Sequence, residues 1–256
     1  MCIRDRLRKK AHFCAIPSTS GTATEVTAFS IITDYDKGIK YPIADFEITP
    51  DVAIVDPDLA ETMPVKLVAH TGMDAMTHAI EAYVSTANCN YTDPLAIHAI
   101  EMIQANLVKS YNGDMSCRDD MHDAQCLAGM AFSNVGLGVD HGMAHPLSAF
   151  YGIPHGVACA TLLPYVMEFN KDYTGEKFRE IARVMGVEGV DEMSQEEYRQ
   201  AAIDAVIQLS KDCGIAQSLK EIGVKEEDLP TLTDSAMADV CTCLLYTSDA
   251  ADDLTR

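Results

Sequence analysis

The periodicity of apolar residues changes near residue 63, and this change constrains the fold more than any other feature of the chain. Between Phe13 and Pro57, short segments rich in β-branched residues (FSIIT, YPIAD, DVAIVD) alternate with turn sequences such as DYDKG, a pattern typical of strands. From Pro64 onward the apolar residues recur with helical periodicity over long segments. We expect these helical segments at 64–85, 93–111, 118–136, 194–214 and 226–240.

Proline and glycine mark the starts and ends of several predicted helices. Pro64 and Pro94 lie at or just inside two expected helix starts, and Gly113 and Gly214 follow two expected ends, which is the usual asymmetry of these residues. The sequence therefore predicts a β-containing part over 7–63 and an all-helical part over 64–242. No internal repeat or low-complexity segment divides either part.

Composition limits the class of protein. The chain has 256 residues, 48% of them hydrophobic, which is enough for a sizeable core. Its net charge of -20 argues against nucleic acid and anionic membranes as partners. Every apolar run is shorter than the roughly 18 residues of a membrane span, and no signal-peptide pattern is present. The nine cysteines include no CxxC pair, which indicates reduced thiols. We expect a cytoplasmic globular protein.

The two ends look foreign to the rest of the chain. MCIRDR at 1–6 and CLLYTSDAADDLTR at 243–256 resemble translations of an adapter used to build sequencing libraries. We interpret both segments as artefacts and exclude them from the fold, as one would a fusion scar.

Histidine spacing raises the possibility of a metal site. The stretch GVDHGMAHPLSAFYGIPHG at 138–156 contains His141, His145 and His155, and Asp74 lies four residues before His78. Residues four apart share one face of a helix. Imidazoles with one carboxylate suit iron or zinc rather than calcium or magnesium. An Asp-x-x-x-His pair is also common on helix surfaces, so spacing alone leaves both interpretations open.

The remaining histidines carry no pattern of this kind. His12, His70, His98 and His122 are interpreted as exposed or hydrogen-bonded structural residues. Glu81, one turn beyond His78, could orient a metal ligand or be a solvated helix charge.

A second candidate site is the hydroxyl loop, defined here as residues 18–27 (STSGTATEVT). Hydroxyl groups on a flexible turn after an apolar strand suit contacts to phosphate or ribose oxygens. The chain has no GxGxxG or GxxxxGK[ST] sequence, so this loop could equally be an ordinary Ser/Thr turn.

Together these segments resemble the iron-containing alcohol dehydrogenase family. IPSTSGTATEVT is similar to its nicotinamide-side threonine motif, TGMDAMTHAIEAYVS to its first metal helix, and GLGVDHGMAHPLSAFYGIPHG to its histidine signature. The resemblance extends from Phe13 to Thr242. It implies an α/β + all-α fold: the C-terminal part of a Rossmann-like dinucleotide-binding domain (7–63), then a mostly complete helical metal-binding domain (64–242) of the dehydroquinate synthase-like fold.

The resemblance also assigns residues. It implies Asp74, His78, His141 and His155 as metal ligands and His145 as a residue for proton handling beside the metal. Cofactor contacts carried over in the same way are Ser18, Thr19, Thr22, Thr27 and Lys40. Two departures from the family pattern are Ala23-Thr24 in place of Gly-Ser and Ser148 in place of Gly.

The implied reaction is hydride transfer between a primary alcohol or short diol and NAD or NADP, with Fe²⁺ or Zn²⁺ polarising the oxygen. Alternatives are a glycerol-dehydrogenase-like or dehydroquinate-synthase-like zinc enzyme, a metallohydrolase, for which no H-E-x-x-H is present, and a non-catalytic metal-binding domain. The family's glycine-rich pyrophosphate loop is absent from the chain, so we predict that the chain alone is inactive. Family members commonly form homodimers or larger homo-oligomers.

Overall fold

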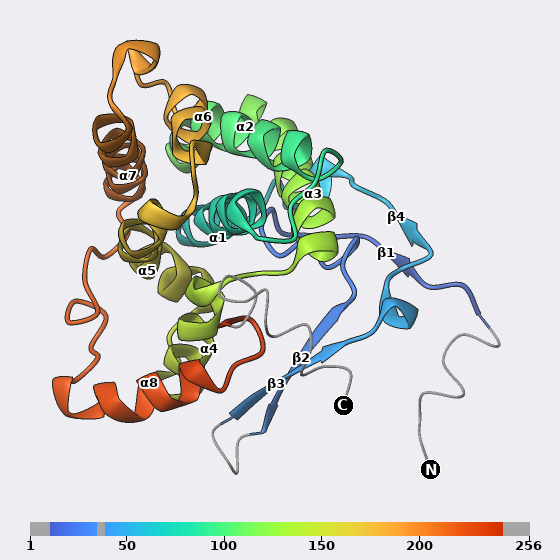
Figure 1. Ribbon diagram of the computed structural model, residues 1–256. Helices are drawn as coiled ribbons and strands as arrows, with labels where there is room; N and C mark the ends of the chain where they lie inside the picture. Colours follow the sequence, from blue (N-terminus) through green and yellow to red (C-terminus); the bar gives the residue numbers. More distant parts are fainter. Residues whose placement is uncertain (1–10, 35–38, 243–256) are drawn as a thin grey trace.

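The computed structural model describes residues 11–34 and 39–242, a small β-containing part and a larger helical body (Figure 1). Both adapter-like end segments lie outside the described residues. The strands are β1 (Cys14–Ala15), β2 (Phe29–Asp34), β3 (Ile39–Ala44) and β4 (Val52–Ala53). The helices are α1 (Val65–Val84), α2 (Asp93–Tyr111), α3 (Arg118–Val135), α4 (Val139–Tyr151), α5 (His155–Asn170), α6 (Lys177–Val184), α7 (Gln195–Asp212) and α8 (Leu229–Met237).

The strands form two separate pairs. β1 and β4 pair in parallel, with Cys14 opposite Val52, whereas β2 and β3 form an antiparallel hairpin with Phe29 opposite Ala44. Parallel pairing of strands separated by a long connection is typical of α/β architecture. The predicted fold class, a partial Rossmann-like part followed by a helical domain, is confirmed.

α1 forms the centre of the helical body (Figure 1). Its buried residues cover the whole circumference of the helix, including Met73, Met76 and Ile80, as expected of a helix surrounded by others. α2, α3, α5 and α6 pack against it. A functional side chain on α1 is therefore held by a rigid apolar core.

The predicted helical segments are confirmed. The structure also contains helices with internal prolines and helices that were not predicted. α4 and α5 contain Pro146 and Pro164 in their interiors, where a proline removes one backbone hydrogen bond. α5 and α6 were not predicted. The eight residues of α6 are too few for a strong periodic pattern, and α5 has a proline inside it and buried residues on all sides. Among the described residues, none of the helices is long and apolar enough to cross a membrane.

Candidate metal centre and hydroxyl loop

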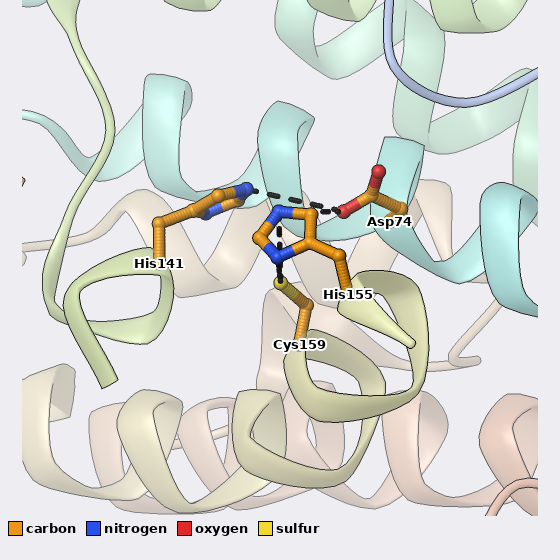
Figure 2. A group of neighbouring side chains, drawn as sticks. All are labelled: Asp74, His141, His155 and Cys159. Atoms are coloured by element: carbon orange, nitrogen blue, oxygen red, sulfur yellow. Dashed lines mark hydrogen bonds and ion pairs between the residues drawn. The ribbon is translucent and has the colours of Figure 1, made fainter. Parts of the chain in front are cut away.

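Three imidazoles converge on one carboxylate oxygen where α1, α4 and α5 meet. The Oδ1 atom of Asp74 lies 4.0 Å from Nε2 of His78, 3.9 Å from Nε2 of His141 and 3.7 Å from Nε2 of His155. We call these four residues the histidine cluster. Figure 2 shows His141 and His155 directed toward Asp74 from two different helices. The structure therefore brings together all four residues that the resemblance implied as ligands.

Glycine makes this convergence possible. A Cβ on Gly156, the residue after His155, would lie 2.2 Å from the backbone oxygen of His70 and 3.4 Å from Cβ of Asp74. Only a residue without a side chain allows the start of α5 to approach α1 this closely. The packing of these two helices is thus what places the imidazole of His155 beside Asp74.

Two donor atoms of the cluster, one on Asp74 and one on His141, are buried without a hydrogen bond among the described residues. Oδ1 of Asp74 and Nε2 of His141 have no hydrogen-bond partner among the described residues, which is costly for buried polar atoms. Two donors about 2.1 Å from one tetrahedral ion are roughly 3.4 Å apart, close to the separations observed here. The donor set therefore fits a divalent transition metal.

Burial also keeps His78 able to bind a metal. The pKa of His78 is lowered to about 3, chiefly by desolvation and also by the neighbouring imidazoles His141 and His155, against the opposing effect of Asp74. Its ring stacks on Phe132, with centroids 4.3 Å apart. The ring is thus neutral near pH 7, the state in which imidazole binds metals.

Glu81 orients His141. Its Oε2 atom lies 2.6 Å from Nδ1 of His141, and its Oε1 atom accepts a hydrogen bond from the backbone N–H of Asp140. Burial alone would lower the pKa of His141, but Glu81 and Asp74 raise it above its usual value. A carboxylate on the outer nitrogen of an imidazole is the usual support of a metal ligand. The structure thereby favours the orienting role of Glu81 over a solvated helix charge.

A thiol adjoins the cluster, and the sequence analysis missed it. Cys159 lies one turn after His155 on α5, and its Sγ atom is 3.7 Å from Nε2 of His155. One ligand atom each from Asp74, His141, His155 and Cys159 lies within 4.8 Å of the others (Figure 2). The four-residue spacing from His155 was the signal available in the sequence, the same spacing that drew attention to Asp74 and His78.

His145 lies beside the cluster and is held by Asp239. Its ring stacks on that of His155 with centroids 5.5 Å apart, and its Nδ1 atom is 2.8 Å from Oδ2 of Asp239. Burial would raise the pKa of Asp239, but the hydrogen bond and charge of His145 lower it overall. Because the ionised carboxylate can only accept, Nδ1 of His145 donates to it, and in the neutral form of the ring Nε2 is then the acceptor. Asp239 is 94 residues away in the sequence, so no local pattern could predict it.

The hydroxyl loop packs against α1 and α3 next to the cluster. A Cβ on Gly21 would lie 2.5 Å from Cβ of Thr71 on α1. The backbone of Gly21 also forms a hydrogen bond with His78, which acts to raise the pKa of that ring. Ser18, Thr22 and Thr24 are exposed, Thr19 is half-buried, and Thr27 is buried. The exposed hydroxyls are therefore available to a ligand near the cluster. Thr27 is buried and can only support the loop from inside the protein.

A buried polar network holds this loop in place. Ala23 has φ of 51°, an unfavourable left-handed conformation for a residue with a Cβ. Its N–H donates to Oε1 of Gln125 at 2.8 Å, and Nε2 of Gln125 donates to Glu25 at 2.7 Å. Ser20 binds Nδ1 of His122 at 3.0 Å.

The other predicted residues have varied positions. His12 and His98 are exposed and His70 is half-buried, as expected of structural residues. His122 is fully buried, and its Nε2 has no hydrogen-bond partner among the described residues. Only its Nδ1 atom is hydrogen-bonded, to Ser20. Lys40 belongs to β3, but its side chain lies outside the part of the chain that the structure describes.

The chain thus combines a small β-containing part with a helical body that carries an Asp-His₃ cluster. A family model described as "Fe-containing alcohol dehydrogenase family, C-terminal" matches residues 68–256, and one described as "Iron-containing alcohol dehydrogenase" matches residues 3–57. The chain belongs to the iron-containing alcohol dehydrogenase family.

Several characterised proteins are similar to this chain. The NADPH-dependent butanol dehydrogenase of Clostridium saccharobutylicum is 55% identical over 240 residues, covering 92% of this chain and 61% of the relative. The lactaldehyde reductase of Escherichia coli strain K12 is 53% identical over 228 residues, covering 89% and 59%. A crystal structure of 1,3-propanediol oxidoreductase superposes with a TM-score of 0.88 at 40% identity, covering 93% of this chain and 63% of that one. The chain thus spans about three-fifths of the length of these relatives.

Proposed function

We propose that this chain carries the metal centre of an alcohol dehydrogenase that transfers a hydride between a primary alcohol or short diol and NAD or NADP. The convergence of three histidines on Oδ1 of Asp74, within 4.0 Å, is the observation that carries the proposal. Asp74, His78, His141 and His155 would hold Fe²⁺ or Zn²⁺. Such an ion supplies Lewis acidity that favours ionisation of an alcohol hydroxyl and polarises an aldehyde carbonyl.

The protein's own residues orient the reactants and move the proton. His145 donates from Nδ1 to Asp239, which leaves Nε2 to accept a proton from the alcohol and return it in the reverse reaction. The hydroxyls of Ser18, Thr19 and Thr22 would bind the cofactor. Thr27 would support the loop from inside, and Lys40 would contact the ribose. A nicotinamide cofactor held by these residues would supply the ring that accepts the hydride from the carbinol carbon.

Membership of the alcohol dehydrogenase family disfavours the lyase, glycerol-dehydrogenase-like and non-catalytic alternatives. A cytoplasmic location stays a prediction, supported by the seven free cysteines among the described residues. Homo-oligomer formation and the artefactual origin of the two ends also stay predictions.

Metal content tests the centre directly. The chain is purified without oxygen beside three variants, His141→Ala, His155→Ala and the exposed His98→Ala. We expect near-stoichiometric iron or zinc in the parent and in His98→Ala, and little in the other two. Equal metal in all four proteins would contradict the ligand assignment.

Activity is tested in two proteins: a chimera that contains residues 7–242 of this chain, and the unmodified chain. Residues 7–242 replace the matching residues of the E. coli lactaldehyde reductase, and nicotinamide-dependent turnover is followed with butanol, 1,3-propanediol and lactaldehyde. We expect turnover in the chimera and its loss with His141→Ala. The unmodified chain should show none, and turnover by it would refute the prediction that it is inactive.

A further inference from the structure

The middle of the hydroxyl loop alternates between buried and exposed residues. Ala23 and Glu25 are buried, with exposed fractions of 1% and 2%, whereas Thr22 and Thr24, on either side of Ala23, are exposed. The Oγ1 atoms of Thr22 and Thr24 lie 3.2 Å apart, so the two hydroxyls form one exposed pair. The backbone conformation of Ala23 between them therefore sets the position of this pair.

Ala23 keeps its conformation because α3 holds it. Its φ of 51° is disfavoured for a residue with a Cβ, and such a conformation persists only where the surrounding structure fixes it. The N–H of Ala23 donates to Oε1 of Gln125 at 2.8 Å. Its methyl group lies against Gly129, where an added Cβ would be only 2.2 Å away. Two residues of α3 thus fix the loop at this point.

A second hydrogen bond fixes the orientation of Gln125. This side chain is fully buried, and its Nε2 atom donates to Oε1 of Glu25 at 2.7 Å. An amide nitrogen only donates and an amide oxygen only accepts, so the bond to Glu25 leaves the oxygen of Gln125 to accept from Ala23. One side chain of α3 therefore holds the two loop residues that flank the exposed Thr24.

The structure assigns Gln125 the role of a positioning residue for the nicotinamide cofactor. Through Ala23 and Glu25 it keeps the hydroxyls of Thr22 and Thr24 together as a preformed pair. This inference rests on the proposed function, in which Thr22 binds the cofactor, and it adds Thr24 as a second contact. Hydroxyls donate and accept hydrogen bonds, and a pair that is already ordered loses little conformational entropy on binding.

The contacts of Gln125 differ from those of a glutamine on the surface. The exposed Gln200 also donates to a carboxylate, that of Asp204, at 2.9 Å, but the two residues are four apart on α7. Gln125 instead joins α3 to residues 100 and 102 positions away in the chain. The proposed metal ligands lie on other helices, so loss of Gln125 should weaken cofactor binding more than metal binding.

The main test uses the zinc-loaded chimera with lactaldehyde reductase described above and the variant Gln125→Met, which keeps the length of the side chain without its amide. Binding of NADH or NADPH, whichever the chimera oxidises, is measured by fluorescence of the reduced nicotinamide. We expect the Kd and the KM for the cofactor to rise by about fivefold or more, as for the loss of one hydrogen bond.

The turnover number separates positioning from stability. We expect kcat per bound metal in Gln125→Met to stay within about twofold of the parent value, because the loss affects binding of the cofactor before and during the reaction alike. Loss of folded protein would instead lower kcat and leave the KM and the Kd unchanged. That second pattern would overturn the positioning role.

A rescue variant and a matched control sharpen the test. The double variant Glu25→Gln with Gln125→Glu exchanges the amide and the carboxylate, so position 125 still accepts from Ala23 and position 25 donates to it. We expect this variant to restore the Kd of the parent, and Gln200→Met to leave it unchanged. Parent-like binding by Gln125→Met would overturn the inference, and so would a loss in the double variant as large as in Gln125→Met.

Removal of the exposed hydroxyls distinguishes this inference from the proposed function. Thr22→Val and Thr24→Val should each raise the Kd by about fivefold, whereas Thr231→Val, an exposed threonine on α8, should not. An unchanged Kd in Thr22→Val would overturn the proposed cofactor contact and this inference with it. A raised Kd in Thr22→Val with an unchanged Kd in Gln125→Met would overturn this inference alone, and an unchanged Kd in Thr24→Val would overturn the second contact.

Hydrogen exchange in the unmodified chain gives an answer that needs no variant. The backbone N–H of Ala23 is buried and hydrogen-bonded to Gln125, so NMR should show it exchanging at least about tenfold more slowly than that of the exposed Thr22. Equal exchange rates at the two positions would overturn the inference. This measurement keeps it testable if Gln125→Met does not fold.

Discussion

The Oε2 atom of Glu81 lies 2.6 Å from Nδ1 of His141, and the side chains are only 2% and 1% exposed. The contact joins α1 to α4 and fixes the direction of the imidazole whose other nitrogen is unpartnered. A buried carboxylate in this position makes the imidazole a stronger ligand and holds its ring in one orientation.

The first prediction concerns this contact. Glu81→Gln keeps the shape of the side chain but removes its charge, so we expect the affinity for zinc to fall by about 10- to 100-fold. Affinity is measured by competition with a chelator. The matched control is Glu101→Gln, because Glu101 also contacts a histidine, His98, at 3.2 Å but on the exposed surface. An equal loss in both variants would contradict the orienting role.

The second prediction concerns pH and the metal-free chain. The pKa of His78 falls from 6.5 to about 3 on folding, chiefly because of burial. Between these values the unfolded chain binds a proton that the folded chain does not, so this histidine lowers the free energy of unfolding as the pH falls. The loss should reach about 3 kcal/mol by about pH 4.

Urea unfolding of the chelator-treated chain is compared with that of His78→Phe, which retains an aromatic ring next to Phe132. The raised pKa of His141 has the opposite effect on stability, because it makes the folded chain bind a proton more tightly. The effect of His78 is therefore the difference between the free energies of unfolding of the parent and of His78→Phe. This difference should depend on pH. Thr77→Val, a neighbour without a titratable group, should differ from the parent by the same amount at every pH.

The third prediction concerns the approach of α5 to α1. Gly156→Ala places a Cβ against the backbone of His70, which cannot move without shifting a helix, so we expect loss of stability and of metal binding together. Gly72→Ala is the control, since its Cβ would meet only the side chain of Leu107, at 2.3 Å. That variant should lose about 1–3 kcal/mol of stability and still bind metal. Full metal binding by Gly156→Ala would contradict the prediction.

The fourth prediction concerns the strained position in the hydroxyl loop. A Cβ on Gly129 would lie 2.2 Å from Cβ of Ala23 and 2.9 Å from Val26, so Gly129→Ala should destabilise the chain by about 1–3 kcal/mol. Ala23→Gly relieves the left-handed backbone at φ of 51° but gives up a packed methyl group, and its own effect should be small.

Combining the two substitutions tests their contact. The double variant should recover at least about 0.5 kcal/mol relative to the sum of the single effects, because the clashing methyl group is gone. Stability is measured by chemical unfolding of all four proteins. Strict additivity would show that the two residues do not contact each other in solution.

Much of the fold could be predicted from local patterns. The helix over 64–85 was expected from its apolar periodicity and is observed as α1, Val65–Val84, because each turn of a helix depends on residues nearby in the chain. The helix α6 was missed because its eight residues give too short a periodic signal, and α5 was missed because its buried residues form one continuous run.

The candidate site was predictable where its residues lie four apart. Asp74 with His78 and His141 with His145 are pairs of this kind, and His155 follows in the same short stretch. Resemblance to the family then implied His155, and not His145, as a ligand. Cys159 has the same spacing from His155, but cysteine is so often a core residue that spacing alone could not single it out.

By itself, the sequence determined most of the helices, the donor types and the family, because these depend on residue identity and on spacing within one or two turns. The tertiary structure alone decided which donors meet: Glu81 with His141, Asp239 with His145, and Cys159 with the cluster. These contacts join segments up to 94 residues apart. The close packing of α1, α4 and α5 sets the contacts of Glu81 and Cys159, and the packing of α8 on α4 brings Asp239 to His145. No local periodicity encodes such distances.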